Sequence, residues 1–224
     1  MHSDFEFIEN NDEFVVINKH NNVDFHCSDT GLGVVAKVSQ MLGNITLYPV
    51  HRLDKMTSGL LIMAKSSHVA AQFGVLFESR TIRKFYLAIS DKKPKKKQGL
   101  IKGDMKKGRN GSYLLLKSND NPAVTQFFSF SVSPGIRGYI LKPHTGKTHQ
   151  LRVAMKSIGA PILGDPRYYP EHQGDVGFLH AWQLQFELSG QAFEFTAPPP
   201  WTINGVEAWL NDMTKPQALS WPKL

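Results

Sequence analysis

Hydrophobic residues recur along the chain with two different periods, and these predict a mixture of helices and strands. Apolar positions three or four residues apart indicate amphipathic helices at about 31–42, 67–77, 148–158 and 206–213. Alternating positions or short continuous runs indicate strands at about 5–8, 14–17, 60–63, 83–90, 113–116, 123–132, 136–142, 178–188 and 193–195. Because half-buried alternation is typical of antiparallel sheets, we expect an α+β fold. Its sheet is mixed but largely antiparallel, with flanking helices and an active-site cleft across it.

The predicted helix ends depend on residues that satisfy exposed backbone groups. The N-cap candidates are Asp29 or Thr30, Ser66 or Ser67, and Thr145 or Thr148, and the C-cap candidates are Gly43 and Gly159. If the third helix begins at its capping threonine, Thr148 and Arg152 are four residues apart and lie together on one face.

Composition limits the protein classes that remain. The chain has 224 residues, 41% of them hydrophobic, so we expect one domain over 1–224. Its single cysteine, Cys27, excludes an intramolecular disulfide framework and a multi-cysteine zinc site. The acidic N-terminus lacks the pattern of a signal peptide, and no apolar stretch is long enough to cross a membrane. We therefore expect a cytoplasmic protein without membrane contact.

Positive charge is concentrated in one segment. Residues 91–109 contain nine Lys or Arg and two Asp, whereas the rest of the chain has equal numbers of basic and acidic residues. We expect a mobile basic loop at about 91–111 that contacts a polyanion, of which nucleic acid is the commonest. Charge alone is equally compatible with a loop that only increases solubility.

One acidic residue stands out by its position. Asp54 lies between Arg52 and Lys55 and is followed by a continuous apolar run at 60–63, which is typical of a buried strand. Thr57, Ser58 and Gly59 favour a turn that holds the carboxylate in one orientation. From these residues alone, an ordinary ion-paired or capping acid is the alternative.

Two other signals have common structural explanations. Tyr86 follows Lys84 by two residues in the strand predicted at 83–90, so both lie on one face, although a strand tyrosine is usually a core residue. The sequence GKT at 146–148 suggests a phosphate loop, but the full pattern requires glycine at position 141, which is Leu141. The sequence therefore argues against a nucleotide triphosphatase, because the nest of backbone amides that cradles phosphate would be missing.

Several stretches, in this order, resemble the RluA-type pseudouridine synthases. The stretch at 51–65 has the family's HRLD, followed by two variable residues, TSGLL and a late Ala-Lys. The resemblance extends over roughly residues 6–200 and rests on HRLDKMTSGLLIMAK at 51–65, KFYLAIS at 84–90, TGKTHQLRV at 145–153, IGAPILGDPRY at 158–168, LHAWQLQF at 179–186 and FTAPPP at 195–200. It implies a stand-alone catalytic domain without the N-terminal S4 module of larger relatives.

The resemblance also implies roles for individual residues. Asp54 matches the family's essential catalytic acid, Tyr86 its active-site aromatic residue and Arg152 the partner of the carboxylate. The implied reaction isomerises uridine to pseudouridine in structured RNA, either ribosomal or transfer RNA. It needs no metal, nucleotide or other cofactor, and we expect a monomer. Further RNA contacts are expected from His51, Arg52, Lys84, Thr148 and Leu179. Leu179 would contact the target base, and Arg52 would hold the flipped-out conformation.

This chain departs from the family pattern at three places. The family's NKPAG is NKHNN at 18–22, which we expect to be a more flexible turn; Met56 replaces a usually acidic residue, and Ala154 replaces the usual His. These departures keep open an alternative function, that of an RNA-binding or RNA-folding factor with little catalytic activity. The presence of Asp54, Tyr86 and Arg152 argues for the enzyme, because simple RNA binding does not require an ionised acid near phosphates.

Overall fold

The computed structural model describes residues 3–27, 31–172, 174–213 and 215–224. The chain divides into two compact units. Unit 1 contains the residues up to Lys84 together with His180–Pro200, and unit 2 contains Phe85–Leu179 and Trp201–Leu224. Helices accompany a mixed, largely antiparallel set of strands, which confirms the predicted α+β class. The single domain over 1–224 stays a prediction.

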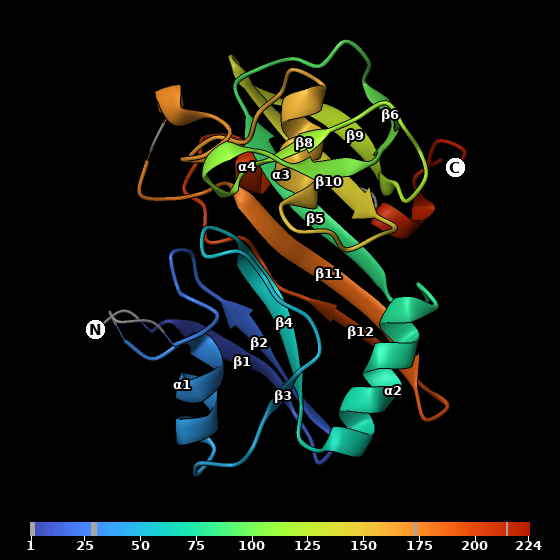
Figure 1. The fold of residues 1–224 in the computed structure, drawn as a ribbon. Helices are drawn as coiled ribbons and strands as arrows, with labels where there is room; N and C mark the ends of the chain where they lie inside the picture. The colour runs from blue at the N-terminus through green and yellow to red at the C-terminus, as the bar shows by residue number, and fades with distance from the viewer. Residues whose placement is uncertain (1–2, 28–30, 173, 214) are drawn as a thin grey trace. The chain divides into compact units, whose positions relative to one another are not determined.

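The strands of unit 1 follow the order β12-β11-β4-β2-β1, with the short β3 also paired to β4 (Figure 1). β4 pairs with β11 in parallel, and the other pairs are antiparallel. All seven residues of β4 are buried, which explains its continuous apolar run. The strands are β1 (Phe5–Asn10), β2 (Phe14–Lys19), β3 (Tyr48–Pro49), β4 (Ser58–Ala64), β11 (Leu179–Leu188) and β12 (Gln191–Thr196).

Two helices belong to unit 1. α2 (Ser67–Glu78) begins as predicted, because the Ser66 side chain accepts a hydrogen bond from the Val69 N–H. Its Phe73 packs against Phe14 and Phe186 in one aromatic cluster. α1 (Val34–Met41) begins after Gly33, and the predicted caps Asp29 and Thr30 lie outside the described residues. None of the helices in the described part of the chain is long and apolar enough to span a membrane.

Unit 2 has an antiparallel strand order β5-β10-β9-β6 and a separate hairpin, β7-β8 (Figure 1). The first two residues of β5 belong to unit 1, and the first residue of β11 belongs to unit 2. The elements are β5 (Arg83–Ser90), β6 (Gln98–Gly103), β7 (Met105–Lys107), β8 (Tyr113–Leu115), β9 (Ala123–Ser133), β10 (Ile136–Pro143), α3 (Gln150–Ser157), α4 (Val206–Asn211) and the 3-10 turns η1 (Arg109–Gly111), η2 (Pro170–His172) and η3 (Pro216–Ala218).

The structure corrects two sequence predictions in unit 2. The basic segment is not a loop throughout, because β6 pairs with β9 and β7 pairs with β8. The lysine run at 92–97 lies outside strands, whereas residues 98–103 and 105–107 find backbone partners on neighbouring strands, which local composition does not reveal. The third helix begins at Gln150, after His149 with a positive φ of 58°, so neither Thr145 nor Thr148 is its N-cap. Thr148 lies exposed in the preceding turn and does not share a helical face with Arg152.

Candidate active site

Asp54 lies in a tight turn directly before β4, in unit 1. Its backbone carbonyl accepts a hydrogen bond from the Thr57 N–H at 3.0 Å, and its side chain is half-buried. The chain then enters β4 through Gly59, whose φ is +109° and where a Cβ atom would lie 2.3 Å from the Ala181 carbonyl oxygen. Only glycine fits so close to β11. The turn and this close strand pairing hold Asp54 at the edge of a buried strand.

Lys19, at the end of β2, is a member of this site that sequence analysis did not identify. Its side chain is fully buried, and its Nζ donates to the carbonyls of His20, Val23 and Lys55 at 2.9, 3.1 and 3.2 Å. Burial lowers the pKa of Lys19 to about 7, although three nearby acids, Asp54 most strongly, act to raise it. Asp54 and Lys19 are therefore electrostatic neighbours. A lysine that ends the apolar run FVVINK was the available signal.

His51 is a structural link of the same unit. Its Nε2 accepts a hydrogen bond from the Ile62 N–H at 3.0 Å, and its ring lies 5.4 Å from that of Phe77. Burial, assisted by the charge of Lys84, lowers the pKa of His51 to about 3. His51 is thus neutral near pH 7 and orients the HRLD segment against β4.

The two predicted cations of unit 1 have different environments. Arg52 is exposed, and its guanidinium carbon lies 5.9 Å from the centre of the Phe25 ring. Lys84 is half-buried, with its Nζ 5.5 Å from the centre of the Phe77 ring, and burial lowers its pKa. Arg52 is therefore the better placed of the two for an RNA phosphate or base.

His180 and Ser58 connect β11 to β4 below the Asp54 turn. His180 Nδ1 lies 2.8 Å from Ser58 Oγ, and its Nε2 lies 2.9 Å from the Ala197 carbonyl oxygen. A carbonyl only accepts, so Nε2 carries the proton and Nδ1 accepts from the serine hydroxyl. Both side chains are fully buried, and desolvation lowers the pKa of His180 to about 4. The folded state therefore favours the neutral imidazole.

This pKa predicts acid destabilisation with a defined sign. Between about pH 6.5 and 4 the unfolded chain binds a proton at His180 that the folded chain does not, so stability falls as pH falls through this range. The full contribution, present above pH 6.5, is about 3 kcal/mol. In urea titrations at pH 7.5 and 5, His180→Asn should show a shallower pH dependence than wild type. The residual dependence would include His51, which acts in the same direction. Replacement of the exposed His68 is the control, and an unchanged slope in His180→Asn would contradict the assignment.

Tyr86 and Leu179 are positioned by β5 in unit 2. Tyr86 is half-buried between the buried Phe85 and Leu87, as the predicted alternation requires, and pairs with Leu141 of β10. Leu179 is 3% exposed. The preceding Phe178 is anchored to β5, because its carbonyl accepts from the Ile89 N–H at 3.1 Å. Both predicted base contacts therefore depend on this one strand.

Arg152 is held by a carboxylate that sequence analysis did not single out, Asp165. Nε and Nη2 of Arg152 each donate to one oxygen of Asp165 at 2.8 Å, and both side chains are buried. Burial raises the pKa of Asp165, but the hydrogen bonds and charge of Arg152 outweigh it, so the pKa lies below its usual value. The backbone N–H groups of Arg167 and Tyr168 also donate to Asp165. In the sequence, the Gly-Asp-Pro stretch at 164–166 was the feature that could have pointed to Asp165.

The predicted residues thus form two sets, one in each unit. Unit 1 carries His51, Arg52, Asp54 and Lys84, and unit 2 carries Tyr86, Thr148, Arg152 and Leu179. The described residues contain no group of three or more His, Cys, Asp or Glu that could hold a metal ion. Ala154 is 3% exposed, so its position is part of the core of unit 2.

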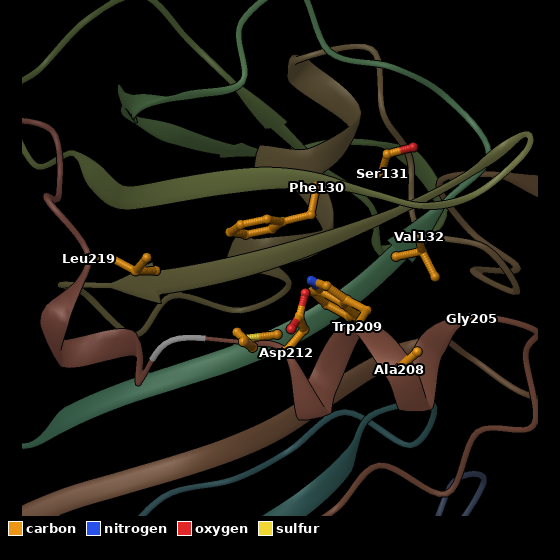
Figure 2. A pocket seen from close by; sticks show the side chains of 9 residues that line it. Phe130, Ser131, Val132, Gly205, Ala208, Trp209, Asp212 and Leu219 are labelled. Atoms are coloured by element: carbon orange, nitrogen blue, oxygen red, sulfur yellow. The ribbon is translucent and has the colours of Figure 1, made fainter.

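A pocket of about 410 Å³ in unit 2 belongs to neither set (Figure 2). It lies between β9 and α4, where the ring centres of Phe130 and Trp209 are 6.0 Å apart. Its lining consists of Phe130, Ser131, Val132, Gly205, Ala208, Trp209, Asp212, Met213 and Leu219. None of the predicted site residues is among them.

Comparison with known proteins identifies related sequences. The family described as RNA pseudouridylate synthase matches residues 13–157. A Haemophilus influenzae protein named as an uncharacterized RNA pseudouridine synthase is 47% identical over 197 residues, which cover 88% of each chain. The tRNA pseudouridine synthase C of Pasteurella multocida is 32% identical, with 68% of each chain covered. A Rickettsia bellii ribosomal large subunit pseudouridine synthase C is 34% identical over 53% of this chain and 41% of its own length.

Solved structures support the fold. The human protein RNA pseudouridylate synthase domain containing 1 gives a TM-score of 0.75 at 22% identity, over 92% of this chain and 93% of that one. The human protein RNA pseudouridylate synthase domain containing 4 gives a TM-score of 0.70 at 24% identity, over 87% of this chain and 88% of that one. The two structures confirm the fold, and the sequence matches confirm the RluA-type resemblance: the chain belongs to the RNA pseudouridylate synthase family, whose members are isomerases that act on RNA.

Proposed function

We propose that this protein isomerises specific uridines in structured RNA to pseudouridine and that Asp54 is the ionised carboxylate on which the reaction depends. Family membership supplies the class of reaction, and one observation chiefly supports the role of Asp54. A half-buried acid is held by a closed turn at the start of a buried strand, beside the buried Lys19. Such a turn presents a carboxylate in one fixed orientation, as an attacking or proton-abstracting group requires.

The reaction breaks the bond between C1′ of the ribose and N1 of uracil, rotates the base and forms a bond from C1′ to C5. The C5 proton is lost and N1 gains one, so no external reactant is consumed. A carboxylate can attack C1′ or remove a proton from C2′, and either route requires one ionised acid. Asp54 fits both, and we assign it no narrower role.

Three residues of unit 2 would assist. Arg152, whose orientation Asp165 fixes, would act as the partner that keeps the Asp54 carboxylate ionised and oriented. Tyr86 would stack on uracil and accept or relay the C5 proton, and Leu179 would supply an apolar contact to the detached ring. Tyr86 is part of β5, and Phe178, next to Leu179, is hydrogen-bonded to the same strand, which would limit the movement of both residues during base rotation.

The substrate must be an RNA from which the target uridine is extruded, which costs a few kcal/mol. Phosphate contacts and filling of the base pocket would offset this cost. The exposed Arg52 is the candidate that holds the flipped-out conformation. Relatives named for ribosomal and for transfer RNA both match this chain, so both RNA classes belong to the proposal.

The direct test is to map pseudouridine. RNA from cells with and without the gene is treated with a carbodiimide that leaves adducts on pseudouridine, and reverse transcription locates the stops. We expect one or a few stops to disappear without the gene and the purified protein to restore them. RNA binding without restored stops would favour the alternative, an RNA-binding or RNA-folding factor.

The basic segment gives a separate prediction on affinity. Lys95, Lys96 and Lys97 are exposed, whereas Lys92 pairs with Asp91 at 3.4 Å. If the three free-standing charges lie near phosphates, changing all three to Gln should lower RNA affinity. It should also reduce the slope of log affinity against log salt by about 2, since each single-strand contact contributes about 0.7. The modified position should not change, because phosphate contacts do not read bases.

A matched variant separates local contact from total charge. Changing Lys117, Lys215 and Lys223 to Gln also removes three exposed charges, from outside the segment. Binding titrations at three or more salt concentrations compare the two variants with wild type. Equal slopes for both variants would mean that the segment makes no special contact with RNA.

A further inference from the structure

The segment after β2 and the Asp54 turn are joined by hydrogen bonds within unit 1. The Asn21 side-chain amide, through Nδ2, donates to the Met56 carbonyl at 2.6 Å. The backbone N–H of Asn22 donates to the Lys55 carbonyl at 2.9 Å, and Lys19 Nζ reaches the same oxygen at 3.2 Å. Asp54's own carbonyl accepts from Thr57. Each of the three carbonyls from Asp54 to Met56 therefore accepts a hydrogen bond.

The Asn21 contact acts on one peptide plane. The carbonyl of Met56 and the N–H of Thr57 belong to the same rigid peptide unit. Asn21 holds the oxygen side of this plane, and the nitrogen side closes the turn on Asp54. If the amide of Asn21 is lost, one of these two restraints disappears and the plane gains freedom to rotate.

The neighbouring residues also restrain the turn. Asn22 donates its backbone N–H to the Lys55 carbonyl, and its φ of 61° is one that asparagine tolerates. Lys19 is buried and anchors three carbonyls, so its replacement would disturb the whole segment. Met56 and Leu53, 5% and 4% exposed, anchor the turn by apolar packing. Packing alone restrains a peptide plane less than a directed hydrogen bond does.

We propose that Asn21 is a positioning residue for Asp54. By fixing the Met56–Thr57 peptide it keeps the turn closed and the carboxylate aimed. The NKHNN segment is then not a loosened turn, because its fourth residue, Asn21, supplies a restraint. This inference rests on the proposed role of Asp54. A catalytic group displaced by about 1 Å loses about 10²-fold in rate, and a partial loosening loses less.

The test compares two truncations at opposite ends of β2. Asn21→Ala should lower kcat about tenfold and leave KM within twofold, because binding contacts are unchanged. Asn21→Asp keeps the shape but replaces the donor by an acceptor facing a carbonyl, and should lower kcat at least as much. Asn11→Ala is the control: Asn11 Oδ1 accepts from the N–H groups of Glu13 and Phe14, so its loss lowers stability without touching the turn.

Hydrogen exchange at Thr57 supplies a readout independent of activity. Its amide should exchange at least about tenfold faster in Asn21→Ala than in wild type, and at the wild-type rate in Asn11→Ala. The inference is overturned if kcat in both Asn21 variants stays within twofold of wild type, if Asn11→Ala lowers kcat equally, or if Thr57 exchange does not change. A wild-type protein inactive on all RNA would refute the proposed function, and Thr57 exchange would still decide whether Asn21 restrains the turn.

Discussion

Asp54→Asn is expected to lower the rate of pseudouridine formation at least about 10⁴-fold while RNA affinity stays within about threefold. The amide has the size of the carboxylate but no negative charge, so it can neither attack C1′ nor take a proton from C2′. Affinity should persist because phosphate contacts supply most of it. Single-turnover assays with saturating enzyme and a filter-binding titration measure the two quantities separately.

A second acid of the same unit provides the control. Asp24 forms an ion pair with Lys55, whose Nζ lies 2.7 Å from Oδ2 of Asp24. Like Asp54, it attracts the charge of Lys19. Asp24→Asn therefore also removes a negative charge beside the turn, and we expect less than a tenfold loss of rate. Turnover by Asp54→Asn comparable to that of Asp24→Asn would remove Asp54 from its proposed role.

Tyr86→Phe is expected to lose about 10²-fold in rate and to bind RNA as wild type does. The ring that stacks on uracil remains, but the hydroxyl that would handle the C5 proton is absent. Single-turnover rates measured across a pH series, together with RNA affinity, check this result.

The matched variant is Tyr139→Phe, on the neighbouring strand β10. Its hydroxyl donates to the Lys92 carbonyl at 2.7 Å, so the variant should lose about 1 kcal/mol of stability and keep its rate. A rate for Tyr86→Phe within twofold of wild type would mean that Tyr86 only packs.

Much of the local structure follows from the sequence. The apolar run at 60–63 became the buried β4, and Ser66 became the N-cap of α2, as predicted. The alternation at 123–132 became β9. These features depend on periodicity and capping among residues close in the chain, which a single sequence displays directly. Asp54 was recognised for the same reason, since its turn and strand are contiguous.

Contacts between distant segments were decided by the tertiary structure. β11 pairs in parallel with β4 across about 120 residues, and β6 became a strand in a lysine-rich segment because β9 offered backbone partners. Which backbone groups become neighbours depends on the packing of the whole unit, and local propensity does not encode it.

The supporting residues of the candidate site belong to this second class. The sequence alone identified Asp54, Tyr86 and Arg152 as residues that match a family pattern. Only the fold paired Arg152 with Asp165, buried Lys19 against the Lys55 carbonyl and turned Asn21 toward Met56. Each of these contacts satisfies a buried or half-buried polar side chain. The partner of such a group is set by which donors and acceptors folding excludes from water, and that is a property of the packed chain.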